Sequence, residues 1–245
     1  MPFPSQTRQL GDLPNLNILA VHTTTPRLSV AITRGGRTLA ETTLPPARKH
    51  LENLAPAIKD LTDELPLDLH DIDGFAVARG PGSFSGIRAG IATIKGMALA
   101  LGKPVVGIGS LEILAWQAAE LGDRVAPIID ARRGEVYTAI YEKTGAGLEC
   151  CHGPALIKMD SLVSLAGNFE GLLTICGDTV ADPIVESHSR LVRSPVTVPS
   201  ASACAARAAD RLREGRVDSL HALAPLYIRR SDAEEKRMAA IESPK

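Results

Sequence analysis

The chain has few aromatic residues and almost no excess charge. Phe, Trp and Tyr together make up 3% of its 245 residues, and the formal net charge at pH 7 is −1. So few rings exclude the arrays of stacking side chains with which proteins read single-stranded RNA. The balanced charge excludes a strongly basic nucleic-acid-binding protein. We therefore expect any contact with RNA to be local or to go through a partner protein.

Patterns for metal binding, disulfides and membrane insertion are also missing. The four cysteines include no C-x-x-C pair, and Cys150 and Cys151 are adjacent, which suits neither a metal site nor an ordinary disulfide. The first residues lack a charged segment followed by an apolar one, and no apolar run reaches membrane-spanning length. These absences predict a cytoplasmic protein with free thiols, no metal and no membrane contact.

The apolar patterns predict an α/β fold with a mixed sheet, because a strand meander is followed by helix, strand and helix. The expected strands are 17–22, 28–33, 37–44 and 72–78, and the expected helices are 47–65, 87–101 and 200–214. Residues 125–140 repeat the strand–turn–strand pattern of residues 17–32 at a constant offset, and 172–180 repeat the strand and glycine turn of 75–83. Similar hairpins also arise by chance, so the repeat alone does not decide between one domain and two related lobes.

The most informative segment is RGPGSFSGIRAG, residues 79–90, between an expected strand and an expected helix. Its spacing, G-x-G-x-x-x-G, is one residue too long for the dinucleotide fingerprint, and no Gly-Lys-Ser/Thr or G-x-S-x-G follows. Two interpretations remain, namely a pocket of backbone N–H groups for an anion and a tight turn that needs glycine for its backbone angles. The residues concerned are Gly80, Gly82, Ser83, Gly86 and Arg88.

Three blocks of sequence resemble one family. GPGSFSGIR with the following residues 95–115, IDARRGEVY at 129–137 and PLYIRR at 225–230 closely resemble conserved blocks of the TsaB family. The resemblance spans roughly residues 16 to 236. TsaB proteins are the bacterial dimerisation subunits of the machinery that makes threonylcarbamoyladenosine on tRNA. The resemblance implies the duplicated, ribonuclease H-like lobes of actin and Hsp70-like ATPases. We then expect a disordered extension over 1–15, a first lobe over 16–115 and a second over 116–245, whose last segment is free to pack back on the first.

The residues that would support catalysis in this fold are missing. Relatives place an aspartate after the first strand, where this chain has His22, and an imidazole is a poor ligand for magnesium. The related TsaD subunit holds a metal with H-x-x-x-H, whereas the corresponding helix here has only His50. Asp130 and Glu135 flank Arg132 and Arg133, and we expect these charges to pair and fix the turn. The sequence offers no catalytic set, no metal site and no cofactor.

Two predicted helices carry apolar residues at heptad-like spacing. The resemblance implies that these helices meet matching helices of TsaD in a four-helix bundle, although the same stripes would also cover the first sheet. We expect Pro56 to interrupt the first helix, while the second is apolar on more than one side. The candidate interface residues are Leu54, Ile58, Leu61, Ile87, Ile91, Ile94 and Met97.

The leading hypothesis is a non-catalytic scaffold that binds TsaD, acts in a complex with a TsaE-type ATPase, and contacts tRNA only through that complex. A homodimer of the free chain is a corollary, because an unfilled apolar seam often self-associates. The alternative is a nucleotide-binding enzyme that hydrolyses its ligand with the glycine loop and Asp130. A dinucleotide-binding oxidoreductase is disfavoured by the glycine spacing and by the antiparallel start of the sheet.

Overall fold

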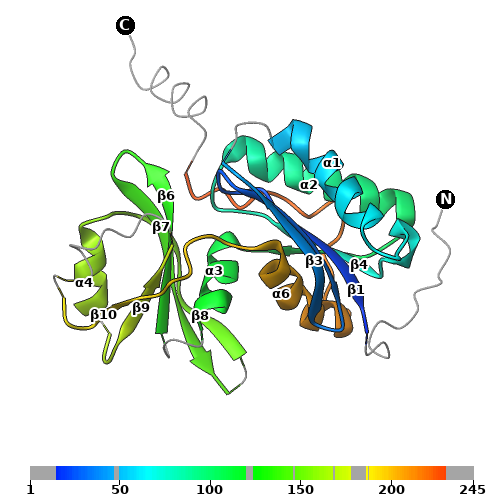
Figure 1. The fold of residues 1–245 in the computed structure, drawn as a ribbon. Coiled ribbons are helices and arrows are strands. Elements are labelled where there is room, and N and C mark those ends of the chain that lie inside the picture. Colours follow the sequence, from blue (N-terminus) through cyan, green and yellow to red (C-terminus); the bar gives the residue numbers. More distant parts are fainter. Residues whose placement is uncertain are drawn as a thin grey trace, which may run out of the picture.

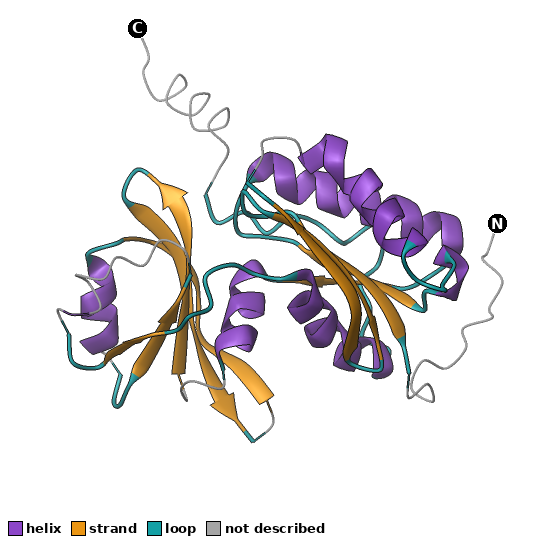
Figure 2. Ribbon diagram, in the orientation of Figure 1, coloured by secondary structure: helices purple, strands orange, loops and turns teal. Residues whose placement is uncertain are grey.

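The computed structural model describes residues 15–46, 50–119, 124–145, 147–167, 169–177, 186 and 188–229. The chain forms two five-stranded sheets that lie beside one another, each with helices packed against it (Figures 1 and 2). The extension predicted over residues 1–15 lies outside the described residues except for its last position. This α/β architecture with two mixed sheets confirms the predicted fold class.

The first sheet has the strand order β3-β2-β1-β4-β5. Its first three strands form the predicted antiparallel meander, and β4 and β5 run parallel to β1. All of β4 and nearly all of β1 and β2 are buried, because helices cover both faces of this part of the sheet. The strands are β1 (Asn17–His22), β2 (Leu28–Arg34), β3 (Arg37–Leu44), β4 (Gly74–Ala78) and β5 (Val105–Ile108).

Two helices, α1 (His50–Asp63) and α2 (Phe84–Leu101), cover one face of the first sheet, and α6 (Ala201–Arg213) covers the other (Figure 1). The helix α1 continues through Pro56, so the predicted interruption is wrong. The helix α2 starts before the predicted Ile87, because the Ser83 hydroxyl accepts a hydrogen bond from Gly86 N and caps the first turn. By length and composition α2 is apolar enough to cross a membrane, but in this structure one of its faces is packed on the sheet.

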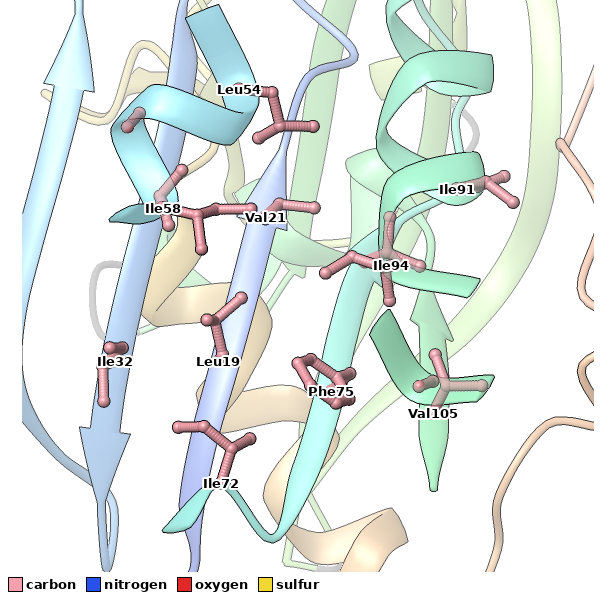
Figure 3. Close-up of a cluster of buried hydrophobic side chains, with 14 of the residues drawn as sticks. Leu19, Val21, Ile32, Leu54, Ile58, Ile72, Phe75, Ile91, Ile94 and Val105 are labelled. Atoms are coloured by element: carbon pink, nitrogen blue, oxygen red, sulfur yellow. The ribbon is translucent and has the colours of Figure 1, made fainter. Parts of the chain in front are cut away.

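A hydrophobic core lies between the helices α1 and α2 and the face of the first sheet that they cover. Figure 3 shows Leu54 and Ile58 of α1 and Ile94 of α2 directed at the strands, where Val21 and Phe75 lie. These side chains are at most 4% exposed. The heptad-like spacing of apolar residues in α1 and α2 therefore reflects their packing in this core.

The second sheet has the order β10-β9-β6-β7-β8. The pairs β6–β7 and β7–β8 are antiparallel, while β6–β9 and β9–β10 are parallel, so both sheets have the same topology. This confirms the duplication. The elements are β6 (Arg124–Arg132), β7 (Glu135–Thr144), β8 (Gly147–Lys158), α4 (Ser161–Gly167), β9 (Leu173–Cys176) and β10 (Leu191–Arg193).

The helix α3 (Ser110–Ala118) joins the two halves, since it packs against β6 and β7 of the second sheet and against α6. Arg207 of α6 donates two hydrogen bonds to Glu112 Oε1, at 2.9 and 2.6 Å, and lies over the ring of Trp116.

After α6 the chain first stays on the first half, where Asp218 accepts a hydrogen bond from Gly107 N at 2.7 Å and Leu226 N donates to the carbonyl of Arg79. It reaches the second half at Arg229, which pairs with Glu135 of β7. We therefore propose that the first lobe comprises residues 16–115 together with α6 and the segment that follows it as far as Leu226.

Candidate functional site

The end of β1 is where the resemblance to actin-like ATPases implies a metal-binding aspartate, and this chain has His22 there. Here four consecutive residues, His22 to Thr25, are at most 6% exposed. The His22 ring nitrogen Nε2 lies 2.8 Å from Thr24 Oγ1, which lies 2.7 Å from the hydroxyl of Ser110. The Thr23 hydroxyl donates to the carbonyl of Gly86 at 2.7 Å. We call His22–Thr25 with Ser110 the threonine corner. It is a filled, hydrogen-bonded part of the core.

The glycine loop is packed directly against this corner. Ser83 N donates to the carbonyl of Thr24 at 2.7 Å. A Cβ atom on Gly82 would lie 2.1 Å from that same carbonyl oxygen, and a Cβ on Gly80 would lie 2.7 Å from the carbonyl of Leu226. Both glycines have positive φ angles, 149° and 107°. The close backbone contacts explain why these positions are glycine, and they favour the tight-turn interpretation over an anion pocket.

The chemistry of the corner does not suit phosphate transfer. It presents hydroxyl groups and an imidazole, whereas magnesium prefers carboxylate, phosphate and water oxygens. The described residues contain no group of three or more His, Cys, Asp or Glu side chains that fits a metal ion. The cysteines are free, and burial raises the pKa of the Cys176 and Cys204 thiols, so these two are weak nucleophiles.

The β6–β7 hairpin differs from the sequence prediction in its ion pair. Asp130 accepts a hydrogen bond from the backbone N of Arg132 at 2.7 Å, but Glu135 pairs with Arg229, which also donates to the carbonyl of Ala131. The sequence gives no local sign of this pair, because Arg229 lies far along the chain, in the block 225–230. The turn residues Arg132 and Arg133 are exposed and have φ angles of 65° and 58°, which are unfavourable for residues with a Cβ.

Six of the seven candidate interface residues belong to the protein's own core. They are at most 5% exposed, and only Met97 is half-buried. They belong to the hydrophobic core between α1, α2 and the first sheet, so they do not form a free docking surface, and the sequence prediction is wrong for them. The i, i+3, i+4 pattern marks the face of a helix that is buried, and it marks the protein's own core as readily as a partner interface. The corrected residues are Leu54, Ile58, Leu61, Ile87, Ile91 and Ile94.

The exposed face of α2 is nevertheless apolar. Ala92, Gly96, Leu99 and Ala100 are all exposed, and Leu99 is 55% exposed. We call these four residues the α2 stripe. A Cβ on Gly96 would meet no atom within 4 Å, so packing inside this chain does not require a glycine there. Beside the stripe, an open groove of about 560 Å³ runs between α1 and α2 and is lined by Ala55, Ile58, Thr93, Met97 and Leu101 among others.

Replacing His22 by alanine tests whether the corner is structural. Because the ring is fully buried and hydrogen-bonded to Thr24, we expect the variant to lose about 1–3 kcal/mol of unfolding free energy. At a temperature where it is folded, it should retain the function proposed below. Chemical denaturation and tRNA nucleoside analysis measure the two effects, and a folded variant without function would show that His22 does chemistry.

Comparisons with known proteins agree with one another. The family model described as TsaD, tRNA N6-adenosine threonylcarbamoyltransferase, matches residues 38–237. The tRNA threonylcarbamoyladenosine biosynthesis protein TsaB of Escherichia coli is 31% identical over 231 residues, covering 90% of this chain and 98% of that protein. TsaB of Bacillus subtilis is 28% identical, covering 90% and 97%.

Solved structures also show similarity over nearly the whole chain. YeaZ from Pseudomonas aeruginosa superposes with a TM-score of 0.73 at 30% identity, covering 86% of this chain and 99% of that chain. In contrast, a tRNA N6-adenosine threonylcarbamoyltransferase of Geotalea uraniireducens is similar over 66 residues, which are 27% of this chain and 19% of that protein. The similarity to the TsaB proteins thus extends over both chains, and the similarity to this transferase is confined to one segment.

Proposed function

Because the chain belongs to the TsaB family, which acts in tRNA threonylcarbamoyladenosine biosynthesis, we propose that it is a non-catalytic subunit. It binds a TsaD-type transferase and enables that enzyme to modify the adenosine next to the anticodon. A TsaE-type ATPase joins the same complex. The free chain pairs with a second copy through the surface that the transferase covers in the complex.

The observation that carries this proposal is Gly96. Glycine within a helix costs about 1 kcal/mol relative to alanine, and no contact inside this chain requires glycine at that position. A neighbouring helix that packs closely on α2 would require it, since small residues let two helix backbones approach. Ala92, Gly96 and Ala100 are spaced four residues apart, so they lie along one side of α2 and form a shallow track.

The threonine corner supports a subunit without its own hydrolytic activity. A nucleotide phosphate would need space and a metal-binding oxygen at the end of β1, where the structure has buried hydroxyl groups and the backbone of the glycine loop. These contacts argue against a nucleotide-hydrolysing site at the end of β1 and the glycine loop.

Two measurements test the proposal. The chain and the TsaD-type transferase of the same organism should co-elute in size-exclusion chromatography. Magnesium and ATP should leave the melting temperature of the isolated chain unchanged, because a ligand that binds only the folded state raises it. A clear rise in melting temperature, together with separate elution, would favour the hydrolase.

The isolated chain should bind tRNA only weakly. Its net charge of −1 provides little attraction to phosphates, so we expect binding that disappears as salt rises towards physiological concentration. Fluorescence anisotropy with labelled tRNA over a salt series measures this. Tight binding by the isolated chain at physiological salt would contradict the assignment of a scaffold.

A further inference from the structure

Two aromatic rings and an arginine form a stack at the start of α2, in which Tyr227 and Arg88 are exposed and Phe84 is half-buried. The Phe84 and Tyr227 rings lie 4.8 Å apart, centroid to centroid, at an interplanar angle of 21°. The Arg88 guanidinium lies 3.9 Å from the centre of the Phe84 ring, and its Nε donates to the Tyr227 hydroxyl at 2.8 Å. We call these three residues the aromatic stack. The hydrogen bond and the ring contacts hold it in one arrangement before any ligand arrives.

The aromatic stack contributes little to the stability of the core. Neither ring belongs to a hydrophobic core cluster of the described residues, and Tyr227 is 39% exposed. The chain has only one Trp, three Tyr and four Phe. Two of these scarce rings are brought together at the surface from positions far apart in the sequence. The composition excludes an array of stacking residues, but it does not exclude a single platform.

The aromatic stack lies on a different side of α2 from the groove shared with α1. Helical spacing places Phe84 and Arg88 on the side of α2 that also carries Lys95. Lys95 donates to the carbonyl of Leu223 at 3.0 Å, so this side faces the C-terminal segment. Thr93 and Met97 instead line the groove towards α1. A ligand on the aromatic stack and a partner in the groove therefore contact different sides of one helix.

Positive charge gathers beside the aromatic stack. Two residues after Tyr227, Arg229 binds Ala131 and Glu135, and this holds the hairpin tip with the exposed Arg132 and Arg133 close to the C-terminal segment. Arg88 makes no ion pair with any carboxylate of the described residues. Arg88, Arg132 and Arg133 are all exposed, on a chain whose net charge is slightly negative.

We propose that this surface is a contact site for single-stranded RNA, at which the aromatic stack receives an unpaired nucleobase and the arginines receive neighbouring phosphates. Unpaired bases bind proteins by stacking on aromatic rings and on guanidinium planes, and arginines beside such a platform bind the backbone. In so far as this RNA is the tRNA of the complex, the inference rests on the proposed function. It adds that this subunit itself touches the loop whose adenosine is modified.

The test uses the full chain assembled with the TsaD-type transferase and labelled tRNA. Tyr227→Ala removes one ring, and we expect it to weaken tRNA binding by the complex about fivefold or more. Tyr227→Phe keeps the ring and should bind within about twofold of the wild type. The double variant Arg132→Ala/Arg133→Ala should lower the slope of affinity against salt by about 1–2. Arg37→Ala is the matched control, because this exposed arginine follows the hairpin turn at the opposite end of β1 from the glycine loop.

Each outcome decides the inference. Weaker tRNA binding by an intact Tyr227→Ala complex supports it, as does ultraviolet cross-linking of tRNA to the peptide that contains Phe84 or Tyr227. Unchanged tRNA affinity overturns it. So does loss of the transferase from the Tyr227→Ala complex, because the aromatic stack would then be a protein contact. If the wild-type chain does not assemble at all, the proposed function fails, and cross-linking of the full chain alone to an anticodon stem–loop RNA at low salt decides the inference. Cross-links at Phe84 or Tyr227 would support the inference, and the absence of cross-links at both residues would overturn it.

Discussion

Replacing Gly96 by phenylalanine is expected to abolish binding to the transferase while the isolated chain stays folded. The position is exposed, and a Cβ placed there has open space around it, so the ring disturbs no contact of this chain. In the complex the same ring would push the two helix backbones apart. We expect the dissociation constant to rise at least about a hundredfold, or roughly 3 kcal/mol.

The measurement is co-elution followed by calorimetric titration, with circular dichroism to confirm the fold. Gly96→Ala should raise the melting temperature slightly, because alanine favours the helix, and should weaken binding much less than phenylalanine does. Asp210→Phe is the matched control, since it places the same ring on the exposed side of α6, across the sheet from α2. Normal binding by the Gly96→Phe variant would show that the transferase does not bind at the α2 stripe.

Replacing Gly82 by alanine is expected to cause the largest loss of stability. The new Cβ would lie 2.1 Å from the carbonyl oxygen of Thr24, and the backbone angle φ of 149° is unfavourable for any residue with a side chain. The strained backbone and the clash with another backbone atom together should cost about 3–5 kcal/mol. That is a large part of the 5–15 kcal/mol typical of a folded domain.

Gly36→Ala separates the two causes. Gly36 also has a positive φ angle, 84°, but a Cβ there would meet nothing within 4 Å. Its replacement should cost only the backbone strain, about 1–2 kcal/mol. Urea denaturation of both variants gives the difference. Equal losses at the two positions would show that the glycine loop is not clamped against the threonine corner.

The sequence predicted most of the fold because local patterns determined it. The strands 17–22 and 37–44 and the helix behind Ser200 agree with the sequence to within about a residue, and the repeated hairpins together with the family resemblance predict the two related sheets. The helix α2 begins before Ile87, the start that apolar spacing predicts, because the cap by Ser83 depends on a hydrogen bond that apolar spacing does not reveal.

The site was less predictable, because burial depends on what packs against each face. The apolar positions of α1 and α2 indicate that these helices bury a face, but not that Ile91 and Ile94 belong to the protein's own core. The proposed partner surface rests on Gly96, and a search for apolar residues at helical spacing does not select a glycine. The pairing of Arg229 with Glu135 and the aromatic stack of Phe84 with Tyr227 join distant segments, and only the folded chain brings them together.

The central claim is that this chain supports the transferase through association and not through chemistry of its own. Its most direct test is the threonylcarbamoyladenosine content of tRNA from cells in which the chain is replaced by variants. The account predicts normal content with the folded His22→Ala variant and no modification with Gly96→Phe. Loss of modification with folded His22→Ala, or full modification with a Gly96→Phe chain that does not bind the transferase, would contradict it.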